Sequence, residues 1–391
     1  MSKTVVVGLS GGVDSSVAAY LLKEQGYKVI GIYMINWHDT TGLLEGDCPT
    51  NDDIIFAKLV ARKLDIEFHT VDLSDEYKKR VVDYMFSEYQ QGRTPNPDVL
   101  CNREVKFDIF VDVAKKYNAD FVATGHYAQK ETIENADGTK TYRLLAGADK
   151  NKDQSYFLCQ LSQEQLAMAM FPIGHMQKPE LRELAKKVEL ATADKKDSQG
   201  ICFVGKVDLP TFLQQKLEPK QGDVVEIPKE FYETIEQSDD YKEFCKPTFY
   251  YKRNGEKIGK HNGAHYYTVG QRRGLNIGGK AEPLFVIATN TYNNTIYVGQ
   301  GKKHPGLYRK ALFIKQEELH WVNTSLKKNI DETEEYLVRI LYRQPLQKAV
   351  IHFHEEGAYI VFDELQRGIT AGQFAAWYKG EELIGSGVIN G

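Results

Sequence analysis

The stretch TVVVGLSGGVDSS, residues 4–16, contains the pattern that decides the fold. Residues 4–8 form an apolar and mostly β-branched run, which predicts a buried strand. Val13, Val17 and Leu21 follow at helical spacing, so the glycines lie in the turn between a strand and a helix. Glycines without a Cβ let backbone N–H groups converge on an anion, and the helix N-terminus adds positive potential. The stretch therefore predicts a phosphate-binding turn.

The turn differs from the two common nucleotide-binding loops. A Walker A loop needs a Gly-Lys-Ser/Thr sequence that does not follow here, and the dinucleotide fingerprint has another glycine spacing. Ser10, Ser15 and Ser16 can donate further hydrogen bonds to an anion. Asp14 can hold Mg²⁺ against a leaving pyrophosphate. A helix-capping turn without a ligand is the alternative, which a lone Gly-Gly pair would favour.

The rest of the chain divides into two parts that differ in their pattern of predicted helices and strands. Strand-like and helix-like segments alternate up to about Asp208, which predicts a doubly wound α/β fold with a parallel sheet. Short alternating segments rich in Gly and Tyr follow, with Asn293-Asn294 as a hairpin signal, and they predict small β-barrels or sandwiches. We expect an α/β domain over residues 1–208, a small β domain over 209–280 and a C-terminal β-barrel over 281–391. The acidic residues 222–243 are interpreted as a solvated insertion.

The composition excludes several classes of protein. The 391 residues are 42% hydrophobic and 27% charged, which excludes disorder, collagen and coiled coil as overall classes. Every apolar run is shorter than the roughly 18 residues of a membrane span, and no secretory leader is visible. Five scattered cysteines exclude a disulfide scaffold, so we expect a cytosolic protein that binds no membrane.

Basic residues are unevenly distributed although the net charge is −4. Residues 246–280 contain eight basic residues and one acidic residue, Glu256, with Tyr250, Tyr251, Tyr266 and Tyr267 between them. A second basic patch consists of Lys302, Lys303, Arg309 and Lys310. A solvated charged face is the alternative, but two clusters with interleaved aromatic residues favour a surface that follows RNA phosphates.

Two cysteines lie in unusual surroundings. Cys101 ends the rigid string TPNPDVLC, and the nearby Arg103 and Lys106 are expected to lower its thiol pKa. Asp98 is placed to exchange protons with a substrate. Cys202 lies in the polar string DSQGICF. Neither cysteine has a second Cys or His at ligand spacing, so a metal pair is not predicted. The two thiols could instead meet across a cleft, although a small buried core residue is the alternative for Cys101.

Seven strings together resemble one family, the tRNA-specific 2-thiouridylases of the PP-loop ATP pyrophosphatase superfamily. They are SGGVDSS, TPNPDVLCN with the following VKF, ATGHYA, KDQSYFL, DSQGICF, HYYTVGQRRGL and ITAGQFAAWY, and they span nearly the whole chain. The resemblance implies a PP-loop, adenine nucleotide alpha hydrolase-like first domain. It also implies ATP-dependent conversion of the wobble uridine of Lys-, Glu- and Gln-type tRNAs to 2-thiouridine, with release of AMP and pyrophosphate.

The resemblance also implies roles for individual residues. ATP would be bound by Gly8, Leu9, Ser10, Gly11, Gly12, Val13, Asp14 and Ser15, with Met34 and Gly125 on the adenosine side. The target base would be contacted by Asn96, Pro97 and Asp98. Contacts to tRNA are expected from His126, Lys152, Asp153, Gln154, Tyr308, Arg309 and Gln344. Cys202 would carry a persulfide, with Cys101 as second catalytic thiol and Asp98 as a further catalytic residue.

The sulfur step has two open routes: direct attack by the Cys202 persulfide, or attack by hydrosulfide that Cys101 releases from it. Either route ends in a Cys101–Cys202 disulfide. We expect ATP with Mg²⁺ and no stable organic cofactor or protein-only metal site. The expected partners are tRNA and a persulfide donor, either a cysteine desulfurase or a relay protein, and a monomer is expected. Cys159 is expected in the core, Cys245 is interpreted as incidental, and nothing requires a role for Cys48.

Two other functions fit parts of the pattern. An amide-forming PP-loop ligase or synthetase would use the same phosphate turn on a small carboxylate, but it needs neither a cysteine pair nor basic β domains. A non-catalytic RNA-binding protein could keep a vestigial nucleotide fold. The intact turn and the two thiols argue against that interpretation.

Overall fold

The computed structural model describes residues 2–38, 49–197, 208–235, 238 and 240–391. Its first unit is built on a five-stranded parallel sheet in the order β3-β2-β1-β4-β7, which confirms the predicted doubly wound α/β class. The strands are β1 (Thr4–Gly8), β2 (Lys28–Ile35), β3 (Glu67–Asp72), β4 (Phe121–Ala123) and β7 (Ala169–Met170). β1 lies at the centre, so the glycine-rich turn that follows it leaves the middle of the sheet.

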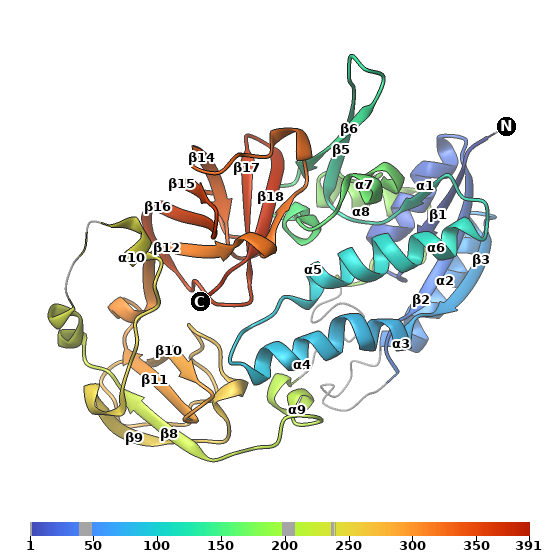
Figure 1. Cartoon of the computed structure of the whole chain (residues 1–391). Helices are drawn as coiled ribbons and strands as arrows, with labels where there is room; N and C mark the ends of the chain where they lie inside the picture. Colours follow the sequence, from blue (N-terminus) through green and yellow to red (C-terminus); the bar gives the residue numbers. More distant parts are fainter. Residues whose placement is uncertain (1, 39–48, 198–207, 236–237, 239) are drawn as a thin grey trace.

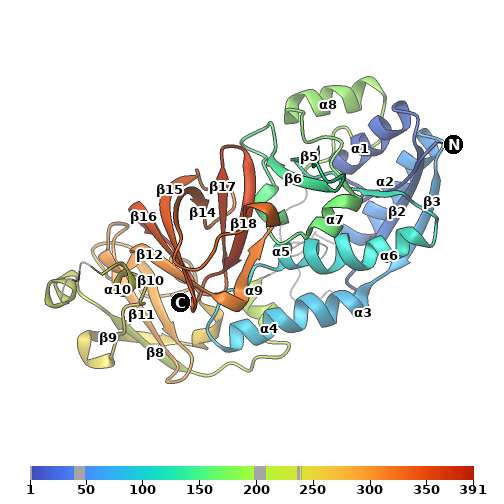
Figure 2. The ribbon, with the colours of Figure 1, turned by 45° about the horizontal axis from the view of Figure 1, so that its top comes forward.

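Helices cover both faces of this sheet, as Figures 1 and 2 show. α1 (Val13–Glu24), α2 (Pro49–Lys63) and α8 (Lys178–Lys187) pack on one face. The other face is covered by α3 (Ser74–Tyr77), the π-helical η1 (Lys78–Val82), α4 (Asp83–Gln90), α5 (Pro97–Cys101), the π-helical η2 (Asn102–Ile109) and α6 (Phe110–Lys115). Side chains alternate across a strand, so Val5 and Val7 face the first group and Val6 faces the second.

Two features inside the first two hundred residues differ from the expected strand–helix alternation. β5 (Ala128–Glu134) and β6 (Lys140–Ala146) form an antiparallel hairpin, and β6 pairs with β18 of the C-terminal unit. After the 3-10 turn η3 (Ser155–Leu158) and α7 (Gln163–Met168), β7 returns the chain to the parallel sheet and α8 packs on it. The N-terminal part of the chain therefore contributes two strands to the C-terminal sheet.

The central unit is a four-stranded sheet in the order β10-β11-β8-β9. Its elements are α9 (Leu209–Leu213), β8 (Gly222–Glu226), α10 (Tyr241–Phe244), β9 (Glu256–His261), β10 (Leu284–Asn290) and β11 (Thr295–Gln300). The expected hairpin at Asn293-Asn294 is confirmed, because β10 and β11 pair around it. Since β10 and β11 belong to this sheet, the central unit extends beyond the expected boundary at residue 280.

The acidic residues 222–243 are not simply a solvated insertion, which corrects the interpretation from the sequence. Residues 222–226 are strand β8 in the middle of the central sheet, where Val224 and Val225 are fully buried. Asp223 and Glu226 flank these two valines, which pack into separate apolar clusters, so the strand is buried at its centre and acidic on either side. α10, later in the same stretch, packs on the C-terminal unit through Tyr241, which stacks on His352 at 4.1 Å between ring centroids.

The C-terminal unit is an antiparallel barrel-like sheet with a core of its own around Trp377. Its strands are β12 (Tyr308–Lys315), β13 (Leu319–Trp321), β14 (Thr333–Arg339), β15 (Gln347–His354), β16 (Gly357–Arg367), β17 (Phe374–Lys379) and β18 (Glu382–Val388). A second apolar cluster runs from the parallel sheet into this unit and includes Phe374, Tyr378 and Val388. The first and third units therefore share a continuous core.

The α4–α5 connection, residues 91–96, is the point at which the three units meet. Both ribbon views show this connection turned toward the two β units. The Thr94 N–H donates to Ala371 O of the C-terminal unit over 2.8 Å. The hydroxyls of Thr94 and Thr268, the latter in the central unit, lie 3.1 Å apart. No helix in the described part of the chain is long and apolar enough to cross a membrane.

Candidate active site

The glycine-rich turn is held in a compact shape by its own serines. The Ser10 N–H donates to Ser15 Oγ over 3.2 Å, and the Ser16 hydroxyl donates to Gly12 O over 2.7 Å. Gly11 has φ +75°, and a Cβ there would lie 2.3 Å from the carbonyl oxygen of Asp53. Only glycine fits this position, because the backbone is left-handed and the neighbouring chain is too close for a side chain. The turn is therefore preorganised before any ligand binds.

Three residues expected around the nucleotide lie close to this turn. A Cβ on Gly125 would lie 2.6 Å from the backbone nitrogen of Ser15, so the segment after β4 touches the start of α1. A Cβ on Gly8 would lie 3.2 Å from Met34 Cε. Gly8, Met34 and Gly125 thus gather where β1, β2 and β4 end. This is the edge where open parallel sheets bind ligands.

A lysine and a tyrosine contact the carboxylate of Asp14, the acidic residue of the first turn of α1. Lys178 Nζ lies 2.7 Å from Asp14 Oδ1, and the Tyr127 hydroxyl donates to the same oxygen over 2.9 Å. The same Lys178 Nζ lies 2.8 Å from Asp197 Oδ1. No sequence motif distinguishes Lys178, which starts a helix far away in the chain.

Asp197 is held by three cations. Besides Lys178, Lys152 Nζ lies 2.7 Å from its Oδ2, and Arg182 lies 2.8 Å from its Oδ1. Partial burial by itself would raise the pKa of this carboxyl group. The hydrogen bonds and charges of Lys152 and Lys178 outweigh that effect and bring the pKa to about 2. Asp197 therefore remains ionised and links the KDQSYFL string to the phosphate turn.

A second lysine closes the other side of the turn. Lys195 Nζ donates to Gly11 O over 3.0 Å, forms an ion pair with Asp53, and lies 4.3 Å from the centroid of the Phe56 ring. Burial raises the pKa of Asp53, and the contact with Lys195 opposes this shift. Lysines thus flank the turn on both sides, as an anion site requires.

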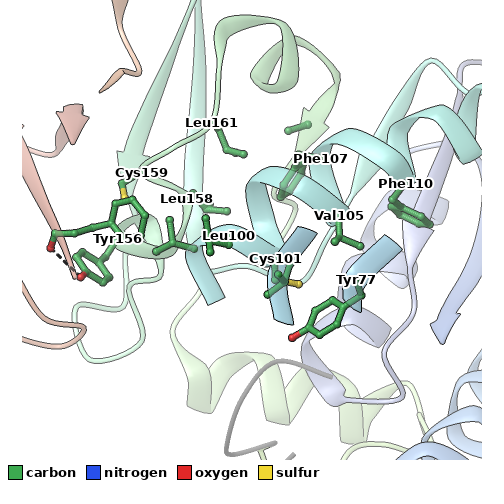
Figure 3. Close-up of a cluster of buried hydrophobic side chains, with 14 of the residues drawn as sticks. Tyr77, Leu100, Cys101, Val105, Phe107, Phe110, Tyr156, Leu158, Cys159 and Leu161 are labelled. Atoms are coloured by element: carbon green, nitrogen blue, oxygen red, sulfur yellow. Dashed lines mark hydrogen bonds between the residues drawn. The ribbon is translucent and has the colours of Figure 1, made fainter. Parts of the chain in front are cut away.

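Helix α5 carries Cys101, one of the two predicted catalytic thiols and the one that lies in the described part of the chain. Asn96 caps this helix, because its Oδ1 accepts a hydrogen bond from the Val99 N–H over 3.3 Å. Cys101 is the last residue of α5, is fully buried, and lies in the apolar cluster of Tyr77, Leu100 and Val105 that Figure 3 shows. η2 and α6 continue directly from α5. The alternative of a buried core position thus describes where Cys101 lies, while its catalytic role stays a prediction.

The other cysteines divide into two groups. Cys202 and Cys48 lie outside the described residues, so their expected roles stay predictions. Cys159 is fully buried, as expected, and burial raises its pKa to about 12. Cys245 is buried against the C-terminal unit, where its thiol donates to Leu312 O over 3.2 Å, and burial raises its pKa to about 12 as well. Neither of these two thiols is suited to nucleophilic chemistry.

Comparison with known proteins now defines the family. Three family models match in succession: the tRNA methyl transferase HUP domain over residues 3–206, the tRNA methyl transferase PRC-barrel domain over 242–300, and the aminomethyltransferase beta-barrel domain over 312–389. The protein named tRNA-specific 2-thiouridylase MnmA in Flavobacterium johnsoniae is 58% identical over 99% of this chain and 100% of its own length. The proteins of the same name in Christiangramia forsetii and Halalkalibacterium halodurans are 57% and 45% identical, again over 99% of this chain, and over 100% and 94% of their own lengths.

The chain belongs to the tRNA-specific 2-thiouridylase family. The descriptions of the first two domain models mention methyl transfer, whereas the full-length relatives are named as thiouridylases. Identity of 57–58% over nearly the whole chain is the stronger criterion, because each domain model covers only part of the chain. The family resemblance of the seven strings is thereby confirmed.

The 2-thiouridylase residues expected to contact tRNA in the first unit have internal partners. His126 is buried, its Nδ1 lies 2.7 Å from the Thr124 hydroxyl, and burial holds its pKa well below the usual value. Asp153 is 3% exposed, and its Oδ2 accepts from Arg339 of β14 over 2.9 Å. Such burial does not favour direct tRNA contact by either side chain. Lys152 and Gln154 are partly exposed, and their tRNA contacts stay predictions.

The expected 2-thiouridylase tRNA contacts of the last unit lie near its junction with the central unit. Arg309 donates to Cys245 O over 2.6 Å, and burial lowers its pKa. Gln344 accepts from the Ile340 N–H over 2.9 Å and donates to Gln366. Tyr308 is partly exposed, and its hydroxyl donates to Lys302 O over 3.0 Å. Their roles in tRNA binding stay predictions.

Proposed function

We propose that the protein is an ATP-dependent tRNA-uridine 2-sulfurtransferase. The observation that carries the proposal is a preorganised phosphate turn flanked by Lys178 and Lys195, in a chain whose full-length relatives are named tRNA-specific 2-thiouridylases. The turn supplies the nucleotide site, and helix α5, which packs on a face of the same parallel sheet, carries Cys101. ATP is a substrate, and no further organic cofactor is needed.

The first step activates the uracil. The C2 carbonyl oxygen attacks the α-phosphorus of ATP, the bond to the β-phosphate breaks, and pyrophosphate leaves. The C2 oxygen, a poor leaving group, becomes part of a departing AMP. One more negative charge develops on the leaving pyrophosphate, at the former α–β bridging oxygen, so backbone N–H groups of the turn and the ammonium groups of Lys178 and Lys195 stabilise it. Mg²⁺ bound with ATP would supply further charge neutralisation, and the Asp14 carboxylate at the turn is a suitable oxygen ligand.

The second step replaces oxygen by sulfur. In one route the terminal sulfur of a Cys202 persulfide attacks C2, AMP leaves, and Cys101 then attacks the Cys202 sulfur as the bond to the thiouridine sulfur breaks. In the other route Cys101 attacks the persulfide first and releases hydrosulfide, which attacks C2. Both routes leave a Cys101–Cys202 disulfide, and an external dithiol must supply two electrons to reduce it.

The decisive experiment supplies the protein with unmodified tRNA, ATP, Mg²⁺, a dithiol and a persulfide donor, a cysteine desulfurase with cysteine, and analyses the digested tRNA by mass spectrometry. We expect 2-thiouridine at the wobble position, with one AMP and one pyrophosphate for each sulfur inserted. Cys202→Ser should abolish thiolation and leave tRNA affinity within about twofold. Wild-type thiolation by Cys202→Ser would remove the persulfide assignment, and the absence of tRNA-dependent pyrophosphate release would overturn the proposal as a whole.

The same assay separates the proposed function from that of an amide-forming ligase. A ligase would exchange pyrophosphate into ATP with a small carboxylic acid and without tRNA, whereas the sulfurtransferase requires the RNA. In the cell the sulfur would come from a partner protein that carries a persulfide. We place the reaction in the cytoplasm, because both tRNA and ATP are available there.

A further inference from the structure

The segment before α5 is unusual because it can form few backbone hydrogen bonds of its own. Residues 94–97 read Thr-Pro-Asn-Pro, and the two prolines have no N–H group. The segment therefore depends on outside partners for its shape. One of them is the ITAGQF string of the C-terminal unit, since the Thr94 N–H donates to Ala371 O over 2.8 Å.

The side chain of Gln373 makes the closest set of polar contacts to this segment. Its Nε2 donates to Thr94 O over 2.9 Å and to Pro95 O over 3.1 Å. Its Oε1 accepts from Asn96 Nδ2 over 3.4 Å. One carboxamide thus binds three consecutive residues. A side chain that lacks either the donor or the acceptor cannot reproduce all three contacts.

The backbone around Gln373 is itself anchored, so the carboxamide is presented rigidly. The Gln373 N–H donates to Thr370 O over 3.3 Å, and Gln373 O accepts from the Ile389 N–H over 2.8 Å. The preceding Gly372 has φ +90°, and a Cβ there would lie 2.9 Å from Thr94 O. The glycine permits the close approach of the two segments that the hydrogen bonds require.

The contact acts on the start of α5. Asn96 Oδ1, the end of the amide that does not face Gln373, accepts from the Val99 N–H. The backbone Asn96 O accepts from the Leu100 N–H over 3.4 Å. At the other end of α5, Asn102 Nδ2 donates to both Asp98 O and Phe157 O over 3.0 Å. The helix is thus fixed at both ends, and its N-terminal anchor comes from the C-terminal unit.

We propose that Gln373 is a positioning residue for thiolation. Resting on the proposed function, this assigns the C-terminal unit a part in the chemistry besides any RNA contact: Gln373 sets the orientation of Asn96 and of helix α5, and through them the positions of Asp98 and Cys101. It touches neither ATP nor the thiols. Misplacement of reacting groups by about 1 Å costs roughly a hundredfold in rate, so a loosened anchor has a measurable effect.

The test uses the full chain with Gln373→Met, which keeps the length of the side chain but removes its polar atoms, and Gln373→Glu, which removes the donors and directs a carboxylate at two carbonyl oxygens. The matched control is Gln347→Met, because Gln347 lies in the same unit and its side-chain amide donates locally, to Pro345 O, among the described residues. Thiolation kinetics give kcat and the KM for ATP. Hydrogen–deuterium exchange is measured on the peptide that contains Val99 and Leu100.

We expect kcat to fall about tenfold or more in Gln373→Met and further in Gln373→Glu, with the KM for ATP within about twofold of wild type. Exchange at Val99 and Leu100 should accelerate about tenfold in both variants, while Gln347→Met matches wild type in both measurements. Unchanged exchange in the Gln373 variants would overturn the positioning role. The exchange readout needs no activity, so it remains decisive if the wild-type protein proves not to thiolate tRNA.

Discussion

At the scale of single residues, Lys178 is the side chain whose replacement tests the nucleotide site most directly. Its ammonium group lies within 2.8 Å of both Asp14 and Asp197 and next to the phosphate turn. We expect Lys178→Gln to raise the Kd for ATP about tenfold, because a charged hydrogen bond to phosphate contributes roughly 1.5–3 kcal/mol. Isothermal titration with a non-hydrolysable ATP analogue and Mg²⁺ measures this.

Lys186 supplies the control for this prediction. It lies on the same helix, α8, but its ion pair with Asp194 is exposed. Lys186→Gln should therefore bind the analogue as the wild type does. Equal affinity of the wild type and Lys178→Gln would show that Lys178 only ties the two aspartates together.

The phosphate turn and Lys178 also show what the sequence can and cannot indicate. The glycine-rich turn could be predicted because the turn, the strand before it and the helix after it are all encoded within residues 4–24. Lys178 is 164 residues from Asp14, and nothing in the helical pattern of residues 178–187 distinguishes its side chain from the other lysines. Gln373 escaped notice for the same reason, since its partners at residues 94–96 are far away in the chain.

At the scale of elements, the errors concern strands whose partners are distant. β5 and β6 pair locally with each other, but their place beside β18 depends on chain more than 200 residues later. β8 was not predicted as a buried strand, because its acidic side chains suggest exposure although the adjacent Val224 and Val225 are both buried in apolar clusters. The α/β alternation of the first unit was predictable because its hydrophobic periods are strong and each crossover is short.

The link between η3 and strand β14 provides a prediction at this scale. Arg339 and Asp153 form an ion pair whose side chains are 10% and 2% exposed, between the first and third units. Asp153 Oδ1 also accepts from the Gly147 and Ser155 N–H groups over 3.0 Å. Arg339→Met leaves the carboxylate buried without its cation, and this should cost about 3–5 kcal/mol.

Thermal and urea unfolding of the full chain measure this cost. Lys348→Met, which replaces an exposed lysine of the same sheet, should leave the transition unchanged. The double variant Asp153→Asn with Arg339→Met should recover much of the loss, because no buried charge remains. An Arg339→Met protein as stable as the wild type would contradict the inferred role of the ion pair in holding the two units together.

At the scale of the whole molecule, burial lowers the pKa of histidines in all three units: His126, His261, His265, His304, His320 and His352. Their pKa in the unfolded chain is about 6.5, so below that pH the unfolded state binds more protons than the folded state. Stability is therefore complete above about pH 6.5 and is lost progressively as the pH falls below it. We expect a lower Tm at pH 5.5 than at pH 7.5 at constant ionic strength. His126→Asn should reduce this difference, and equal Tm values for the wild type at the two pH values would refute the prediction.

The ion pairs of the central unit indicate which of its basic residues are available to bind RNA, which the number of basic residues alone does not. Asp223 neutralises Lys252 and Lys257 at 2.6 and 2.7 Å, and Glu226 pairs with Lys280 at 2.6 Å. Among the described residues, no ion pair involves Arg272 or Arg273, and both are exposed. Arg272 lines a hollow of about 580 Å³ that is formed by the segment leading from β9 to β10, together with Lys280 and Leu284. These two arginines are thus available to phosphates, whereas the paired lysines are not.

The salt dependence of tRNA binding tests whether the arginines or the paired lysines contact phosphates, because each neutralised phosphate releases counterions. The slope of log Kd against log salt counts the phosphates that the protein neutralises, at roughly one unit for each contact. Arg272→Ala with Arg273→Ala should weaken tRNA binding and reduce the slope by up to about two. Lys252→Ala with Lys257→Ala removes the same formal charge but frees Asp223, so its slope should match that of the wild type. If the lysine pair changed the slope and the arginine pair did not, the RNA would lie along β8 and β9 rather than across the loop of residues 270–280.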